Sequence, residues 1–268
     1  MSKPFAYNGL PVRCVRRART GESPRLLLMH GLGGRRGAWD RFVEEMTAPF
    51  DLWDVELPWH GMSTGEWGRG GDPVRVLADL LAGERFDVLV AHSYTANLLT
   101  EAYATGLVRP RPSVLIGPCY RPSADDFDWQ TISYYLNDFH KTFVEALRVG
   151  QTNRYSEAHR DWMALRMRDQ VGPYGWMRFF ETYLRSPFLD LTGVAAPVLV
   201  LTGEADIAGR PADGQALAEA LPDGRFTLLP GCGHFPMLEQ PQRTARIIGE
   251  FLTRLCSPAE AAAVPTTH

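Results

Sequence analysis

A short apolar strand that leads into a serine and then into a helix most constrains this sequence. Residues 86–91 form a short, mostly apolar run with two valines, which predicts a buried parallel strand, and residues 95–104 carry apolar residues at helical spacing. Ser93 lies on the tight turn between them. On such a turn the hydroxyl stands clear of the sheet, above a helix N-terminus, which favours a nucleophile. The alternative role for the same residue is an ordinary helix N-cap.

The residues around Ser93 match the usual nucleophile turn only in part. That turn has the form Gly-x-Ser-x-Gly, and here Ala91 and Thr95 stand at the glycine positions. Glycine is preferred there because the strand and helix backbones approach each other closely. Ser93 therefore needs partners elsewhere in the chain before it counts as a nucleophile.

Charge and cysteine spacing argue against several function classes. The formal net charge of -3 over 268 residues gives no reason to expect a nucleic-acid partner. The four cysteines are far apart and lack metal-ligand spacing, and no apolar run suits a signal peptide or a bilayer span. We therefore expect a reduced, cytoplasmic setting, and a disordered tail over residues 257–268. The oligomeric state is not readable from these features.

Strand and helix patterns alternate along residues 1–120 and again along 189–256, which predicts an α/β core. The Asn8-Gly9 turn signal predicts an opening hairpin. Later strands are expected at 25–29, 51–57, 86–91, 113–116, 197–201 and 225–229, and helices at 37–46, 73–83, 95–104, 212–221 and 241–255.

Residues 121–188 interrupt this alternation, because strand signals stop there. One apolar stripe predicts a helix, and two more helices are expected at 162–167 and 176–184; the stripe is Ile132, Leu136, Phe139, Phe143 and Leu147. This segment holds 14 of the 29 aromatic residues. That excess predicts a helical lid whose inner face forms an apolar pocket wall against the sheet.

Three candidate catalytic residues follow expected strands, in the chain order Ser93, Asp206, His234. Ligands of open parallel sheets bind outside the carboxyl ends of the strands. A serine nucleophile also needs a base to take its proton and an acid to orient that base. Asp125 and Asp126, just after the strand at 113–116, are rival candidates for the acid.

These features resemble the α/β-hydrolase superfamily over nearly the whole chain. The matching segments, besides the turn at Ser93, are HGLGG at 30–34, LPWHGMS at 57–63, GEAD at 203–206 and GCGHFPMLEQP at 231–241. The family order of nucleophile, acid and histidine is kept. The family has a glycine where Trp59 stands.

The resemblance implies a mostly parallel sheet of about eight strands flanked by helices, with the lid inserted after the sixth strand. It also implies that Ser93 attacks an acyl carbon, that His234 is its base and that Asp206 holds the imidazole. The backbone N–H groups of Leu32 and Tyr94 would form the oxyanion hole. The implied substrate is a moderately apolar ester, thioester or lactone, and the implied chemistry needs no metal or organic cofactor.

Other activities fit the same residues. The superfamily also includes acyl transfer, macrocyclisation, carbon–carbon bond hydrolysis and lyase reactions. Loss of both turn glycines leaves a non-catalytic ligand-binding protein as a further alternative. Among the remaining side chains, we expect His30 and His60 to hydrogen-bond within their loops, His92 to point away from the pocket, and Cys232 to pack inside its loop.

Overall fold

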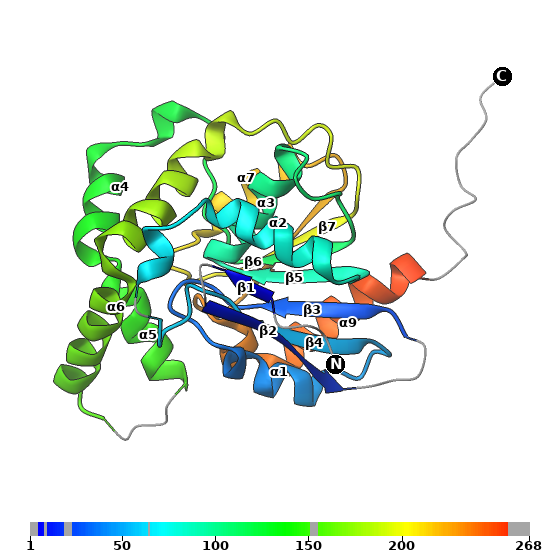
Figure 1. Cartoon of the computed structure of the whole chain (residues 1–268), viewed down its shortest axis with the longest axis horizontal. Coiled ribbons are helices and arrows are strands. Elements are labelled where there is room, and N and C mark those ends of the chain that lie inside the picture. The colour runs from blue at the N-terminus through cyan, green and yellow to red at the C-terminus, as the bar shows by residue number, and fades with distance from the viewer. Residues whose placement is uncertain (1–4, 8–9, 19–22, 64, 151–154, 257–268) are drawn as a thin grey trace.

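The computed structural model describes residues 5–7, 10–18, 23–63, 65–150 and 155–256, which build one eight-stranded sheet and the helices around it (Figure 1). The strand order is β1-β2-β4-β3-β5-β6-β7-β8. The strands are β1 Phe5–Tyr7, β2 Leu10–Ala18, β3 Arg25–Met29, β4 Asp51–Glu56, β5 Val88–His92, β6 Ser113–Ile116, β7 Val198–Gly203 and β8 Gly224–Leu229.

Strands β3 to β8 pair in parallel, whereas β2 is antiparallel to both β1 and β4. The register places Ala91 beside Met29 on one side and beside Leu115 on the other, so the ends of β3, β5 and β6 are level. The β1–β2 pairing agrees with the expected opening hairpin, although Asn8 and Gly9 themselves lie outside the described residues. The tail at 257–268, expected to be disordered, also lies outside the described residues.

Both faces of the sheet are covered, which explains why the inner strands β3, β5, β6 and β7 are almost entirely apolar and buried. Leu89 and Ala91 of β5 pack into one hydrophobic core, and Val88 and Val90 pack into the other. The first core lies under α2 (Pro73–Gly83), α3 (Tyr94–Ala104) and α7 (Pro211–Ala220), and the second lies under α1 (Asp40–Glu45) and α9 (Pro241–Cys256) (Figure 1). The short α8 (Pro236–Glu239) precedes α9.

The helical segment between β6 and β7 gathers at one end of the sheet (Figure 1). Its elements are η3 Ala124–Asp126, α4 Trp129–Ser133, the π-helical turn η4 Tyr134–Asp138, α5 His140–Gly150, α6 Glu157–Arg185 and η5 Ser186–Phe188. A kink at Gly172 (φ 69°), just before Pro173, divides α6 into two parts. None of the helices in the described ranges combines the length and apolarity needed to cross a membrane.

The stripe predicted across this segment is wrong at Leu136, which is 54% exposed. Tyr135 is buried in its place, at 1% exposure. The cause is the π-helical turn: its i→i+5 bonding widens the helix and rotates the residues relative to an α-helical stripe. Phe139 and Phe143 are buried as predicted.

The end of β7 touches the loop after β8 so closely that only glycine fits. A Cβ on Gly203 would overlap the carbonyl oxygens of Cys232 and Gly233. The two loops are also joined where Ala205 N–H donates to the Cys232 carbonyl at 2.8 Å. Backbone packing at this point therefore fixes how the loops after β7 and β8 lie against each other.

We expect Gly203→Ala to lower the free energy of unfolding by about 2–3 kcal/mol, because the added methyl meets backbone atoms that cannot rotate away. Chemical denaturation measures the loss. Gly83→Ala is the matched control: no described atom lies within 4 Å of its Cβ position, and it ends α2. That control should be neutral, or stabilising by about 0.5 kcal/mol. Equal stability of the two variants would contradict the steric argument.

Candidate active site

Ser93 stands on a strained turn between β5 and α3. Its φ of 53° and ψ of -123° make it the one non-glycine residue with positive φ among those described. Such backbone costs about 1–3 kcal/mol and persists only where its surroundings hold it. Here the Ser93 N–H donates to the Ile116 carbonyl at 2.7 Å, and the Ser93 carbonyl accepts from the Ala96 N–H at 2.8 Å.

The Ser93 hydroxyl is directed to His234 instead of serving as the N-cap of α3. Its Oγ lies 2.9 Å from His234 Nε2, and no capping bond reaches the described N–H groups of α3. The N-cap alternative is therefore wrong for this serine. Ala91 and Thr95, at the two glycine positions, are both fully buried.

His234 links the serine to Asp206. Its Nδ1 lies 2.9 and 2.8 Å from the two carboxylate oxygens of Asp206. A carboxylate can only accept, so Nδ1 carries the proton and Nε2 is left to accept from the Ser93 hydroxyl. The structure thus brings the three predicted side chains into one hydrogen-bonded row.

Asp206 is held in place by its own loop. Its Oδ1 accepts from the N–H groups of Ala208 and Gly209, both at 2.9 Å. Gly117, at the end of β6, packs so near that a Cβ there would lie 3.0 Å from Asp206 Oδ2. The carboxylate is therefore buried with partners on several sides.

The rival acids are placed elsewhere. Asp125 and Asp126 lie in η3, are exposed, and belong to a capping box with Ser123. Asp126 accepts from the Ser123 N–H at 3.1 Å. Geometry therefore favours Asp206 over both as the partner of His234.

Two carboxylates that sequence reasoning missed surround the backbone of the His234 loop. Glu239 accepts from the N–H groups of Gly233 (2.9 Å) and Phe235 (3.0 Å). Glu145, on α5, accepts from the N–H of His234 at 3.3 Å. Glu239 belongs to a segment quoted for the family resemblance, whereas nothing in the local pattern of α5 marks Glu145.

The charge around His234 makes its imidazole more basic than usual. Burial is the largest single influence and would lower the pKa of His234, but the charge and hydrogen bond of Asp206 together with the charges of Glu145 and Glu239 outweigh it. The net effect raises the pKa of His234 above its ordinary value. Burial also raises the pKa of Glu145.

His30 and His60 hydrogen-bond to the loops around them, as expected. His30 accepts from the Leu57 N–H at 2.9 Å and donates to the Gly31 carbonyl at 2.8 Å, and burial lowers the pKa of His30 to about 4. His60 accepts from the Met62 N–H. His92 donates through Nε2 to the backbone carbonyl of His234 at 2.8 Å.

His92 nevertheless lies closer to the site than predicted. Its ring centroid is 4.7 Å from that of His234, so it packs directly behind the base. Burial and the neighbouring His234 lower the pKa of His92 well below its ordinary value, which keeps the ring neutral. Cys232 is buried, and burial raises the pKa of its thiol to about 12, so it is no competing nucleophile.

The loop after β3 passes beside the serine. A Cβ on Gly31 would lie 2.9 Å from Ser93 Cβ, so only glycine permits this approach. Leu32 follows in the loop, and Tyr94 opens α3 directly after the serine. Their backbone N–H groups, predicted as oxyanion donors, thus come from the two segments that flank Ser93.

Helix α5 covers this arrangement. Ser93 is 5% exposed and His234 1% exposed. The ring of Phe143 packs over Gly33, where an added Cβ would meet it at 3.0 Å. The described part of the chain has no cluster of three or more metal-ligating side chains.

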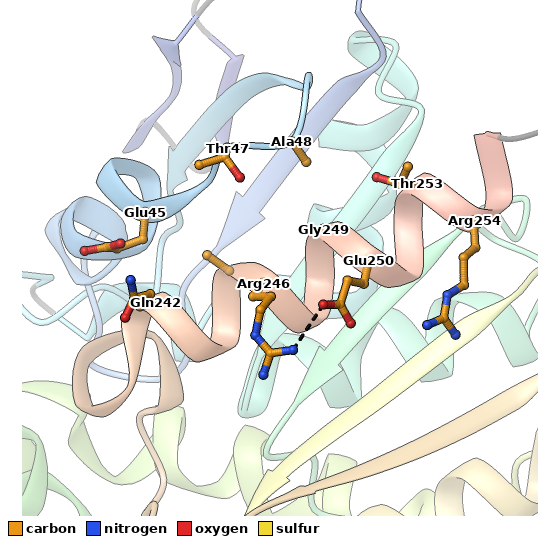
Figure 2. Close-up of a pocket in the computed structure, with 10 residues that line it drawn as sticks. Glu45, Thr47, Ala48, Gln242, Arg246, Gly249, Glu250, Thr253 and Arg254 are labelled. Carbon is orange, nitrogen blue, oxygen red and sulfur yellow. Dashed lines mark hydrogen bonds and ion pairs between the residues drawn. The ribbon is translucent and has the colours of Figure 1, made fainter.

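Two clefts lie away from the serine. One, of about 910 Å³, runs between the end of α1 and α9, where Arg246 and Glu250 form an ion pair (Figure 2). The other, of about 370 Å³, lies inside the helical segment and is lined in part by Tyr135, Phe139 and Trp176. Of these two clefts, only the second is lined by a residue, Phe139, that packs against Phe143 of α5.

Comparison with known proteins agrees with this architecture. The model of the alpha/beta hydrolase family matches residues 26–247. The chain belongs to the alpha/beta hydrolase family. The predicted α/β-hydrolase fold, and the prediction that the chain is an enzyme of this type, are thereby confirmed.

Relatives of this α/β hydrolase include two proteins named pimeloyl-[acyl-carrier protein] methyl ester esterase. The one from Nitrosomonas europaea is 26% identical, over 84% of this chain and 94% of its own length. The one from Edwardsiella ictaluri is 29% identical, over 84% and 92%. A solved bacterial membrane phospholipase A has a TM-score of 0.69 at 20% identity, covering 96% of this chain and 87% of its own.

The raised pKa of His234 predicts a pH profile. If His234 is the base, it acts when neutral, so kcat/KM rises with pH through a pKa above that of an ordinary histidine. Glu145→Gln keeps an oxygen for the His234 N–H but removes one negative charge, while Asp206, Glu239 and the neutral His92 still face the ring. The acid limb should then move to lower pH, because one of the charges that raise the pKa of His234 is gone.

Glu219→Gln is the control for this shift, because Glu219 is an exposed carboxylate on α7. It should leave the acid limb in place. An unmoved limb in Glu145→Gln, measured over the same pH range, would show that Glu145 does not influence the imidazole.

Proposed function

We propose that this α/β hydrolase is a serine hydrolase that cleaves a carboxylic ester, thioester or lactone through an acyl-enzyme intermediate. One observation carries the proposal: the hydroxyl of Ser93, the imidazole of His234 and the carboxylate of Asp206 are hydrogen-bonded in that order. This order gives the nucleophile a base and the base an orienting acid. No metal or organic cofactor is required by any step.

In the first half-reaction, Ser93 Oγ attacks the acyl carbon while His234 Nε2 takes the hydroxyl proton. The carbonyl oxygen becomes negative and accepts hydrogen bonds from the N–H groups of Leu32 and Tyr94, each worth about 3–4 kcal/mol in comparable sites. Collapse of the tetrahedral intermediate breaks the bond to the leaving alkoxide or thiolate, which takes the proton from His234. Asp206 stabilises the imidazolium while it exists.

In the second half-reaction, water replaces the leaving group. His234 removes a proton from the water as it attacks the acyl-enzyme, and the same two N–H groups hold the second oxyanion. The intermediate then releases the carboxylic acid, and Ser93 recovers its proton from His234. Each half-reaction thus returns the imidazole to its neutral form.

We infer that the helical segment, predicted as a lid over 121–188, encloses a moderately apolar acyl group. The aromatic side chains that the segment brings toward the site support this: the Tyr135 hydroxyl donates to the Ala208 carbonyl, two residues after Asp206, although the cleft of about 370 Å³ that Tyr135 lines does not itself include Ser93 or His234. Phe139, another lining residue, packs against Phe143 above the Gly33 loop. The relatives are named for a methyl ester of an acyl chain, which fits this substrate class.

Acyl transfer is the alternative that a specific observation favours. Ser93 and His234 lie beneath α5, and exclusion of water from an acyl-enzyme favours an alcohol or amine acceptor over hydrolysis. Macrocyclisation is the intramolecular form of the same step. Product analysis with added acceptors separates transfer from hydrolysis, while carbon–carbon bond cleavage would require a carbon leaving group.

Replacement of the serine tests both the activity and the non-catalytic alternative. We expect Ser93→Ala to lower kcat on p-nitrophenyl esters by about 10⁴-fold or more, because the acyl-enzyme can no longer form. A fluorophosphonate should label the parent protein and not this variant.

Ser113→Ala serves as the control. Ser113 is also buried, on β6, and among the described residues its hydroxyl bonds only Tyr103 and the Arg111 carbonyl. It should keep kcat and label normally. Full turnover by Ser93→Ala would end the proposal, and failure of the parent protein to label would favour a ligand-binding protein.

A further inference from the structure

Two side chains that stand in place of glycines are joined by a hydrogen bond. The indole Nε1 of Trp59 lies 3.0 Å from the hydroxyl of Thr95. An indole N–H can only donate, so the hydroxyl accepts from it. Both residues are buried, at 1% and 0% exposure, which removes water as a competing partner.

The Thr95 hydroxyl in turn donates to the backbone carbonyl of His30, at 2.5 Å. Because the carbonyl can only accept, and the indole can only donate, the hydroxyl proton has one place to go. The result is a directed relay from Trp59 through Thr95 to His30. It crosses from the loop after β4 to α3 and then to the loop after β3.

A second bond closes this relay into a ring. The backbone carbonyl of Trp59 accepts from the Gly33 N–H at 2.9 Å. Trp59 thus holds the loop after β3 at two points, at Gly33 through its backbone and at His30 through Thr95. Leu32, whose N–H is the proposed second oxyanion donor, lies between the two anchored residues.

We propose that Thr95 and Trp59 are positioning residues that fix the Leu32 N–H for the developing oxyanion. The inference rests on the proposed function, since it assigns a role to residues that act through the oxyanion hole. Neither side chain needs to touch the substrate. Glycine at both positions would leave the His30 carbonyl without this donor and the loop with one anchor fewer.

Thr95→Val tests the relay, because valine has nearly the same shape but no hydroxyl. A donor that is absent costs about 10²–10³-fold in kcat, so a displaced one should cost about 10- to 100-fold. KM should change by less than about threefold, because the oxyanion exists only after attack. Affinity for a boronic acid, which forms a tetrahedral adduct on serine, should fall in step with kcat/KM.

Three further variants separate positioning from simple stability. Thr95→Ser retains the hydroxyl and should restore kcat to within about threefold. Thr100→Val removes another buried hydroxyl from the same helix, whose one hydrogen bond within the described part of the chain is to the Ala96 carbonyl at 2.9 Å, and should lower Tm without lowering kcat. Trp59→Phe removes the donor to Thr95 and also shortens a buried ring that packs against Trp67 and Tyr94; because the Thr95 bond to His30 remains, its loss of kcat should be smaller than that of Thr95→Val.

The outcomes decide between the two roles. A folded Thr95→Val protein with unchanged kcat and boronic acid affinity overturns the proposal, as does an equal loss of kcat in Thr100→Val. If Thr95→Val does not fold, unchanged kcat in Trp59→Phe overturns it instead. Retained turnover in Ser93→Ala would contradict the proposed function itself. That result is distinguishable from the outcomes above, which concern only the role of Thr95 and Trp59.

Discussion

The hydrogen bonds between His234 and the carboxylate of Asp206 are the interaction on which the rest of the site depends. Both side chains are shielded from water, and a buried carboxylate without partners would cost several kcal/mol. Asp206 avoids that cost with the imidazole N–H and two backbone N–H groups of its own loop. The same contact fixes the tautomer that turns Nε2 toward Ser93. Close packing of the loops after β7 and β8 is therefore a condition for the proposed chemistry.

The helical segment is part of this electrostatic arrangement as well as a cover over it. Helix α5 brings Glu145 to the backbone of His234 and Phe143 to Gly33, while the π-helical turn brings the Tyr135 hydroxyl to the Ala208 carbonyl. These contacts reach the histidine loop, the loop after β3 and the aspartate loop. The charge that Glu145 places near the imidazole therefore depends on α5 staying packed against the sheet.

The parts of the fold and site that could be predicted are those that short sequence segments specify. The Ser93 turn, the Asp206 loop and the His234 loop each follow an apolar strand, and parallel pairing brings such loops to one edge. Leu136 could not be placed correctly, because a π-helical turn leaves no signal in apolar spacing. Glu145 could not be assigned either, since its contact with His234 joins residues 89 positions apart and depends on how α5 packs.

The residues that replace the motif glycines show that a departure from a sequence motif need not change the geometry of the site. A glycine in a motif indicates that there is little space for a side chain at that position. It does not indicate which interactions a larger side chain could make in a protein where one fits. In this chain Ser93 keeps its positive φ and its bond to His234, although Thr95 follows two residues later. The added threonine is accommodated because its hydroxyl finds a donor in Trp59 and an acceptor in His30, so burial of a polar group is offset at both ends. Without Thr95 the buried indole N–H of Trp59 would lose its acceptor, whereas Thr95 without Trp59 would keep its bond to the His30 carbonyl, so the tryptophan at this position depends on the threonine.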